Sequence, residues 1–295
     1  MKTGWRCRAC IAALLACATA ACAQEKISAE RADGAQVPLL VYEPARENHA
    51  CPPLVLLSPG AGGDERGLRY LGEALSGKGW RVIAIGHRES GAAALKRDIT
   101  QMRGIRAGLE KMVADPALYR ARFMDIDAAK RWAQSRCRAP FTALIGHSMG
   151  ARTVQLEAGA RNRVGLKPDG GFDAYVALSP SGADSLFAPD SGATINAPIL
   201  MITGTRDDGL GGDYRWRMRA FDALSSGHCD RLAVIDGATH MNLAGALFAS
   251  KTEAAVVPLI ENWLAGVRTG RCIPPPRMDG VKIITQNAAA DQPPR

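Results

Sequence analysis

Residues 146–150 read Gly146-His147-Ser148-Met149-Gly150, a G-x-S-x-G motif around which the rest of the chain can be interpreted. The apolar run Phe141–Ile145 precedes the motif, and the helix-compatible stretch Ala151–Ala160 follows it. This order predicts a strand, a sharp turn and a helix, with Ser148 at the apex of the turn. Glycine is expected at both ends because a side chain there would collide with neighbouring backbone. The motif therefore predicts a serine hydroxyl that projects into a cleft at a helix N-terminus.

Short apolar runs alternate with longer amphipathic stretches beyond an opening hairpin, which we expect over residues 25–45 around Asp33-Gly34. Such alternation is typical of βαβ units on a parallel sheet. Apolar residues recur at helical spacing from Leu95 to Met112 and again from Val256 to Leu264, the final helix. The expected core strands are Leu54–Leu57, Arg81–Ile85, Phe141–Ile145, Ala174–Leu178, Ile199–Thr203 and Arg231–Ile235.

A serine hydroxyl is a poor nucleophile until a base takes its proton, and a carboxylate must orient that base. In proteins built around this turn, the acid follows the serine in the chain and the histidine comes last. Strand Ile199–Thr203 runs into Gly204-Thr205-Arg206-Asp207-Asp208, and the Gly-x-x-Asp spacing selects Asp207 over Asp208 as the acid. His240, in the loop expected after the last strand, is the predicted base.

The other histidines fit the role of base less well than His240 does. His147 lies inside the turn and is expected to be structural. His49 and His228 each precede a strand, at the ends away from the expected cleft. His87 follows a strand, where it can line a pocket, but it comes before the nucleophile in the chain.

Acyl transfer also needs hydrogen-bond donors for the oxygen that becomes negatively charged. The glycine-rich loop Ser58–Gly63 follows strand Leu54–Leu57, and the backbone N–H groups of Ala61 and Met149 are the expected donors. A phosphate-binding loop would continue with Gly-Lys-Ser or Gly-Lys-Thr, whereas this loop continues with Asp64. The dinucleotide-binding fingerprint and the cysteine spacing of a zinc site are missing too, so we expect no cofactor and no metal.

These motifs resemble the α/β-hydrolase superfamily over nearly all of the chain after residue 23. The pieces that carry the resemblance are Ser58-Pro59-Gly60, Gly86-His87-Arg88-Glu89-Ser90, Gly146–Gly150, Gly204–Asp207 and His240. Within the superfamily, the chain looks most like the serine esterases of the dienelactone-hydrolase-like and platelet-activating-factor-acetylhydrolase-like branch. The resemblance implies an α/β-hydrolase fold, a mostly parallel central sheet flanked by helices.

The resemblance also implies the roles of single residues. Ser148 would be the nucleophile, Asp207 the acid and His240 the base, with Ala61 and Met149 as oxyanion donors. The nucleophile is serine, whereas dienelactone hydrolases proper use cysteine. The loop around Ala61 is also similar to that of bacterial polyester hydrolases, which typically carry an aromatic residue at this position.

The activity that the resemblance implies is a serine hydrolase that cleaves carboxylic esters through an acyl-enzyme, with a small-molecule ester as its partner. The same triad also cleaves amides, so an amidase or acyl-peptidase is an alternative. A second alternative is a non-catalytic binding protein on a hydrolase scaffold, although such proteins usually lose a triad residue. Fold alone does not select the substrate, and we expect the pocket walls to come from residues 90–122 and 181–194.

The N-terminus reads as a signal peptide over residues 1–23. Basic residues precede an apolar run, Ala9–Cys22, that is too short to span a bilayer. Ala21-Cys22-Ala23 fits a small-x-small cleavage pattern, which makes Gln24 the first residue of an exported protein, periplasmic or secreted. The alternative is a lipoprotein signal with lipid on Cys17 or Cys22, and only then do we expect a membrane as partner.

The formal net charge is +8, and part of it lies in this leader. The remaining Lys and Arg residues are scattered along the chain and do not gather in one stripe. A scattered positive charge is typical of a solubilising surface, so we expect no nucleic acid as partner.

Four cysteines follow the leader, and an even number in an exported protein favours disulfides. Cys51 and Cys137 come just before two strands that are parallel neighbours in this fold. The final helix returns Cys272 to the start of the strand that Cys229 enters. We therefore expect Cys51–Cys137 and Cys229–Cys272, on the side of the sheet opposite the cleft. Residues 24–272 would form the hydrolase domain, and the Pro-rich tail 273–295 is expected to fray.

Overall fold

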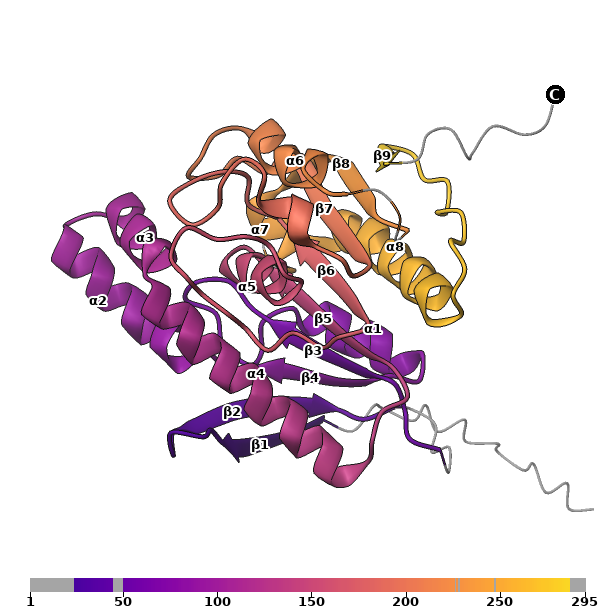
Figure 1. The fold of residues 1–295 in the computed structure, drawn as a ribbon, viewed down its shortest axis with the longest axis horizontal. Helices are drawn as coiled ribbons and strands as arrows, with labels where there is room; N and C mark the ends of the chain where they lie inside the picture. The colour runs from indigo at the N-terminus through magenta and orange to yellow at the C-terminus, as the bar shows by residue number, and fades with distance from the viewer. Residues whose placement is uncertain (1–23, 45–49, 226, 228, 247, 287–295) are drawn as a thin grey trace, which may run out of the picture.

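The computed structural model describes residues 24–44, 50–225, 227, 229–246 and 248–286 (Figure 1). The predicted leader, His49 and His228 lie outside these residues. Within the described part, nine strands form one sheet in the order β1-β2-β4-β3-β5-β6-β7-β8-β9. They are β1 (Gln24–Glu30), β2 (Gln36–Tyr42), β3 (Leu54–Ser58), β4 (Arg81–Ile85), β5 (Thr142–His147), β6 (Ala174–Leu178), β7 (Ile199–Arg206), β8 (Arg231–Thr239) and β9 (Val281–Thr285).

The centre of the sheet is parallel from β4 through β8, and antiparallel strands border it on both sides. Every residue of β3 and β6 is buried. Burial on both faces explains why the central strands read as continuous apolar runs in the sequence. The opening hairpin is confirmed: β1 pairs antiparallel with β2, and Gly34 in the turn has φ of 82°.

All the expected core strands are present, and β4 and β6 have the expected bounds. The strands β7 and β8 extend beyond the expected ends, to Arg206 and Thr239, across a register shift between Gly204 and Arg206. A Cβ at Gly204 would overlap the backbone of Ala238, so glycine permits this close pairing. The prediction that His240 lies in a loop is therefore wrong. His240 directly follows β8 and is the first residue of a helix.

The expectation that residues 273–295 fray is wrong for Val281–Thr285, which forms β9 and pairs antiparallel with β8. The run expected to be the last strand, Arg231–Ile235, is therefore next to last. Val281 and Ile283 pack on one face of the sheet, while Ile284 packs on the other. The added strand covers the edge of β8, whose backbone N–H and C=O groups would otherwise be unpaired.

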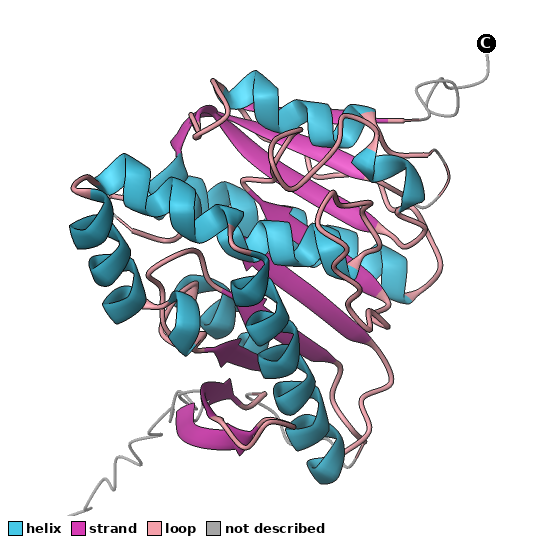
Figure 2. Cartoon of the chain, turned by 60° about the vertical axis from the view of Figure 1, so that its left-hand side comes forward, coloured by secondary structure: helices cyan, strands magenta, loops and turns pink. Residues whose placement is uncertain are grey.

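Helices cover both faces of the sheet, as Figures 1 and 2 show. Residues of α4, α5 and α6 belong to the core cluster on one face, and residues of α1 and α8 belong to the cluster on the other. The helices are α1 (Arg69–Gly77), α2 (Ala92–Met102), α3 (Ile105–Ala114), α4 (Pro116–Arg136), α5 (Met149–Glu157), α6 (Tyr214–Asp222), α7 (His240–Leu243) and α8 (Ser250–Arg268).

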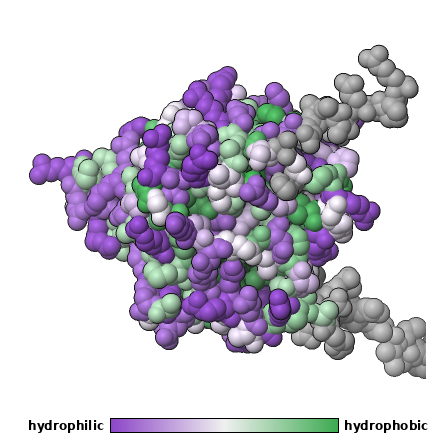
Figure 3. Space-filling model, in the orientation of Figure 1, coloured by the Kyte–Doolittle hydropathy of each residue, from purple (hydrophilic) through white to green (hydrophobic). Residues whose placement is uncertain are grey.

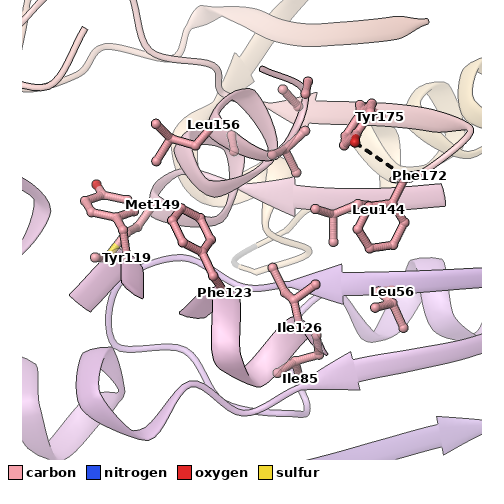
Figure 4. Packing of buried hydrophobic residues seen from close by; sticks show 14 of the residues in the cluster. Leu56, Ile85, Tyr119, Phe123, Ile126, Leu144, Met149, Leu156, Phe172 and Tyr175 are labelled. Carbon is pink, nitrogen blue, oxygen red and sulfur yellow. Dashed lines mark hydrogen bonds between the residues drawn. The ribbon is translucent and has the colours of Figure 1, made fainter. Parts of the chain in front are cut away.

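The core beneath α4 is predominantly aliphatic and aromatic (Figure 4). Phe123 and Ile126 of α4 lie above the strands that carry Leu56 and Ile85. Burying one such side chain stabilises the fold by roughly 1.5–3 kcal/mol. The outer surface is mostly hydrophilic, and hydrophobic side chains are scattered over the face that Figure 3 shows.

The apolar residues spaced helically between Leu95 and Met112 belong to two helices, α2 and α3. Arg103, at φ 55°, ends α2, and α3 folds back against it. A Cβ on Gly108 would lie 2.6 Å from the Cα of Ile99, so the absence of a side chain lets the two helices approach closely. Met102 is consequently 47% exposed while Met112 is fully buried.

Both expected disulfides, Cys51–Cys137 and Cys229–Cys272, are present, with Cα–Cα distances of 5.6 and 5.3 Å. Cys51 and Cys137 lie just before β3 and β5, which are parallel neighbours. Cys229 lies just before β8, and Cys272 follows the end of α8. Both disulfides therefore lie at the edge of the sheet where the parallel strands begin. Residues such as Ser148 lie at the other edge, where the strands end.

Candidate active site

Ser148 lies between the end of β5 and the start of α5, with φ of 56° and ψ of −114°. A Cβ on Gly146 would overlap the backbone of Gly150, and a Cβ on Gly150 would overlap the carbonyl of Ser58. Only glycine fits at these two positions because the neighbouring backbone leaves no room for a side chain, as we expected from the motif. A non-glycine residue in such a conformation costs about 1–3 kcal/mol, which the surrounding fold has to offset.

The structure brings together the serine, histidine and aspartate that the sequence selected. His240 Nε2 lies 3.0 Å from Ser148 Oγ, and His240 Nδ1 lies 2.8 Å from Asp207 Oδ1. A carboxylate only accepts, so Nδ1 carries the proton and Nε2 is left to accept from the serine hydroxyl. The three residues follow the C-terminal ends of β5, β7 and β8. Their alignment therefore depends on the pairing of the parallel strands.

The carboxylate of Asp207 is fully buried and held from several directions. Its Oδ2 accepts a hydrogen bond from Thr203 Oγ1 at 2.9 Å, and its Oδ1 lies 3.0 Å from Arg217 Nε. The neighbouring Asp208 is exposed. The structure thus distinguishes the two carboxylates in the way that the Gly-x-x-Asp spacing predicted.

Arg217 on α6 is a residue of this site that the sequence did not reveal. Its Nε donates to the carbonyl of Asp207 at 2.7 Å, and its Nη1 lies 3.2 Å from the carbonyls of Ser179 and Pro180. Burial lowers the pKa of the guanidinium, while the charge of Asp207 opposes that shift. Arginine on an amphipathic helix is usually a surface residue, so no sequence pattern marks this one.

His147 supports the backbone of His240, in agreement with the structural role expected for it. Its Nε2 donates to the carbonyl of His240 at 3.0 Å, and the two ring centroids are 4.6 Å apart. Burial and the nearby charges of His240 and Arg217 hold the pKa of His147 well below 6.5. The ring is therefore neutral at physiological pH and adds no charge beside His240.

The loop after β3 lies against the turn that carries Ser148. A Cβ on Gly60 would be 3.2 Å from the Cβ of Ser148, and Ala61 lines the same pocket as Ser148. Met149 is the first residue of α5, and the first N–H groups of a helix have no partner within it. The positive end of the helix dipole also points at this spot. Both predicted oxyanion donors are thus positioned near the hydroxyl.

A pocket of about 220 Å³ opens beside Ser148 and His240. Leu109, Val113 and Ser181 come from the wall segments that we expected, whereas Gly209, Leu210 and Trp216 do not. Two larger pockets, of about 730 and 500 Å³, are lined by other residues and not by Ser148, Asp207 or His240. The chemistry of the lining, and not the volume, identifies the candidate site.

The part of the chain that the structure describes contains neither a cluster of metal-binding side chains nor a membrane-spanning helix. Within residues 24–286, apart from the gaps named above, no group of three or more His, Cys, Asp and Glu residues is arranged to hold a metal ion. In the same part of the chain, no helix has the length and apolar character needed to cross a bilayer.

Family models and curated proteins give no match to this chain. Solved structures do resemble it at low sequence identity. The Pyrococcus furiosus esterase Pf2001 is 16% identical, with 82% of this chain and 93% of that chain aligned at a TM-score of 0.55. Est1E from Butyrivibrio proteoclasticus is also 16% identical, with coverage of 81% and 99% and a TM-score of 0.55.

An acylaminoacyl peptidase from Pyrococcus horikoshii is 11% identical, with a TM-score of 0.59. The alignment covers 83% of this chain and 42% of the peptidase, so this chain matches less than half of that protein. At these identities the likeness concerns the fold. The parallel sheet, the helices on both faces and these structural neighbours together show that the chain has the fold of the α/β hydrolases.

Proposed function

We propose that this protein is a serine hydrolase that cleaves carboxylic esters through an acyl-enzyme. The observation that carries the proposal is the hydrogen-bonded series from Ser148 through His240 to the buried Asp207. A base 3.0 Å from the hydroxyl, oriented by a carboxylate, is the arrangement that activates serine as a nucleophile.

In the first half of the reaction, Ser148 Oγ attacks the ester carbonyl carbon while His240 Nε2 takes the hydroxyl proton. The carbonyl oxygen becomes an oxyanion, which accepts hydrogen bonds from the N–H groups of Ala61 and Met149. The negative charge of Asp207 stabilises the imidazolium that forms. When the C–O bond to the leaving group breaks, His240 returns its proton to the departing alkoxide, and the acyl group remains on Ser148.

In the second half, a water molecule replaces the alcohol and the roles repeat. His240 Nε2 takes a proton from the water, whose oxygen attacks the acyl carbon. The same N–H groups donate hydrogen bonds to the second oxyanion. Collapse of this intermediate releases a carboxylic acid and returns the proton to Ser148 Oγ.

The pocket supports a small acyl group as the part of the substrate next to the serine. Its volume of about 220 Å³ is below the roughly 300–1,000 Å³ of pockets that enclose drug-sized ligands. Leu109, Val113 and Trp216 give it apolar walls. We therefore expect esters with short acyl chains to be better substrates than esters with long ones.

The names of the structural neighbours point in two directions. One is an esterase, and another is an acylaminoacyl peptidase. This chain aligns with 93% of the esterase and with 42% of the peptidase. Ester cleavage is therefore the better-supported proposal, and cleavage of an acylated amide is the second candidate.

The experiment that tests the proposal is labelling with a fluorophosphonate probe, followed by mapping of the modified peptide. Wild-type protein should be labelled on Ser148, and Ser148→Ala should not be labelled. Ser135→Ala, which changes an exposed serine on α4, is the matched control and should react like the wild type. A panel of p-nitrophenyl esters and matched anilides then separates esterase from amidase. Absence of labelling on Ser148 in folded wild-type protein would refute the proposal.

A further inference from the structure

A second polar cluster lies beneath the loop that carries Ala61, and the mechanism above does not use it. Ser58, His87, Arg122 and Asp125 are 0%, 1%, 1% and 2% exposed, respectively. They come from the end of β3, the turn after β4 and the middle of α4. Burying charged and polar groups is costly unless they are paired. The cluster is therefore held in place by specific contacts.

The contacts of the cluster form a directed series of hydrogen bonds. Arg122 Nη1 donates to Ser58 Oγ at 3.3 Å, and Ser58 Oγ lies 2.9 Å from His87 Nε2. His87 Nδ1 in turn lies 2.8 Å from Asp125 Oδ2. Because arginine only donates and a carboxylate only accepts, the serine proton points to Nε2 and the imidazole proton to Asp125.

This series contains serine, histidine and aspartate, yet it is not a second nucleophilic site. All of its side chains are buried, so no ester can reach Ser58. Burial and the charge of Arg122 lower the pKa of His87 to about 4, against the opposing effect of Asp125. The imidazole is therefore neutral and acts as a fixed link between a hydroxyl and a carboxylate.

Arg122 extends the series to the backbone of the loop after β3. Its Nη1 donates to the carbonyl of Pro59 at 2.8 Å, and its Nη2 donates to the carbonyl of Gly60 at 3.4 Å. Its Nε donates to Ser90 Oγ at 2.9 Å, and the carbonyl of Ser90 accepts the N–H of Gly62 at 2.8 Å. One buried guanidinium thus joins both ends of the loop to α4 and to the turn after β4.

The carbonyl of Gly60 and the N–H of Ala61 belong to the same peptide group. That peptide is trans, so its C=O and N–H point in opposite directions. The carbonyl accepts hydrogen bonds from Arg122 Nη2 and from the N–H of Gly63, the latter at 3.1 Å. Fixing the carbonyl on one side fixes the direction of the N–H on the other. A cation at the carbonyl also draws electrons from the amide and makes its N–H a stronger donor.

Arg122 keeps its charge in this position. Burial lowers the pKa of its guanidinium to about 10, which leaves it protonated at neutral pH. The motif Gly86-His87-Arg88-Glu89-Ser90 has no role in the triad, but it helps to hold Arg122 in place. Ser90 accepts directly from Arg122, and His87 holds Ser58, which is the next acceptor.

We propose that Arg122 is a positioning residue of the oxyanion hole, which orients and polarises the Gly60–Ala61 peptide while Ser58, His87, Asp125 and Ser90 hold the guanidinium in place. The inference rests on the proposed function, in which Ser148 attacks a carbonyl and the N–H of Ala61 donates a hydrogen bond to the resulting oxyanion.

The experiment compares Arg122→Lys with Arg231→Lys. Arg231 is another buried arginine that donates to a backbone carbonyl, that of Ile273, at the opposite end of the sheet. Loss of a whole oxyanion donor costs roughly 10²–10³ in kcat, so a misaligned donor should cost about 10–100-fold. We expect Arg122→Lys to lower kcat for a p-nitrophenyl ester by that factor with KM little changed. We expect Arg231→Lys to stay within about twofold of the wild type.

If Arg122 had a purely structural role, Arg122→Lys would weaken binding of the transition state and of the ground state by the same factor. A trifluoromethyl ketone, which forms a tetrahedral oxyanion on the serine, should bind Arg122→Lys more weakly by the same factor as the loss in kcat. The carboxylate product should bind it as it binds the wild type. Equal losses for ketone and product, or a folded Arg122→Lys with wild-type kcat, would overturn the inference.

The rate of fluorophosphonate labelling separates this inference from the proposed function. If wild-type Ser148 does not react, the proposed function fails. If Ser148 reacts equally fast in wild type and in Arg122→Lys, only the role of Arg122 fails. Should Arg122→Lys not fold, Ser90→Ala removes the acceptor of Nε and keeps the guanidinium. Labelling slowed several-fold would then support the inference, and an unchanged rate would refute it.

Discussion

Replacing Asp207 by asparagine tests the electrostatic part of the triad separately from its geometry. Asp207 Oδ1 accepts from His240 Nδ1 at 2.8 Å and lies 3.0 Å from Arg217 Nε, while Oδ2 accepts from Thr203 Oγ1 at 2.9 Å. In Asp207→Asn, the amide oxygen should keep the place of Oδ1 because two donors face it. The amide NH₂ then faces the threonine hydroxyl, which can accept. Arg217 Nη2 lies 3.2 Å from His240 Nδ1, but the amide oxygen remains the acceptor at 2.8 Å, so we expect the histidine tautomer to be preserved and only the negative charge to be lost.

The size of the effect follows from the charge that is removed. Two unit charges about 4 Å apart interact by roughly 4 kcal/mol at an effective dielectric constant of about 20. When the imidazolium forms in Asp207→Asn, this stabilisation is missing. A loss of about 4 kcal/mol in the transition state corresponds to a fall in kcat of about 10³-fold.

The assay is kcat for a short-chain p-nitrophenyl ester, measured beside Asp208→Asn as the matched control. Asp208 is exposed at the edge of the pocket, and the hydrogen bond to His240 Nδ1 comes from Asp207, so Asp208→Asn should lose far less activity than Asp207→Asn. Circular dichroism and thermal unfolding should show that both variants are folded. Equal losses in the two variants, or a loss below about tenfold in Asp207→Asn, would refute the electrostatic role assigned to Asp207.

Other predictions concern the disulfides, the N-terminus and pH. Peptide mapping without reduction should recover Cys51–Cys137 and Cys229–Cys272, whereas four free thiols would contradict the pairing. Removing either bond should lower the free energy of unfolding by about 2–4 kcal/mol. N-terminal sequencing of the exported protein should begin at Gln24, whereas lipid on Cys17 or Cys22 would show a membrane anchor. His87 has a pKa of about 4 in the folded state and about 6.5 in the unfolded chain. The unfolded state therefore binds more protons between these values, and stability should fall as pH drops from about 6.5 to 4, less steeply in His87→Gln.

The sequence by itself determined those features whose signal is local or follows chain order. The turn around Ser148 needs glycines that the backbone contacts explain, and the parallel core strands are apolar because both their faces are buried. Chain order selected Asp207 and His240, and strand order selected the disulfide partners. The turn and the strands follow from backbone sterics and hydrophobic periodicity, which can be read from neighbouring residues, whereas the triad residues and the disulfide partners follow from the order of the motifs along the chain.

Only the tertiary structure decided which distant side chains support the triad and its loop. Arg122 and Arg217 are spaced like ordinary surface residues of a helix, yet both are buried and donate to loop carbonyls. The strand Val281–Thr285 lies in a Pro-rich tail and is stabilised by pairing with β8. Contacts of this kind join residues far apart in the chain, and their stability comes from burial and pairing in the folded state. No local pattern of residues encodes such contacts, because the partner that makes a buried guanidinium or an edge strand favourable is supplied by another part of the fold.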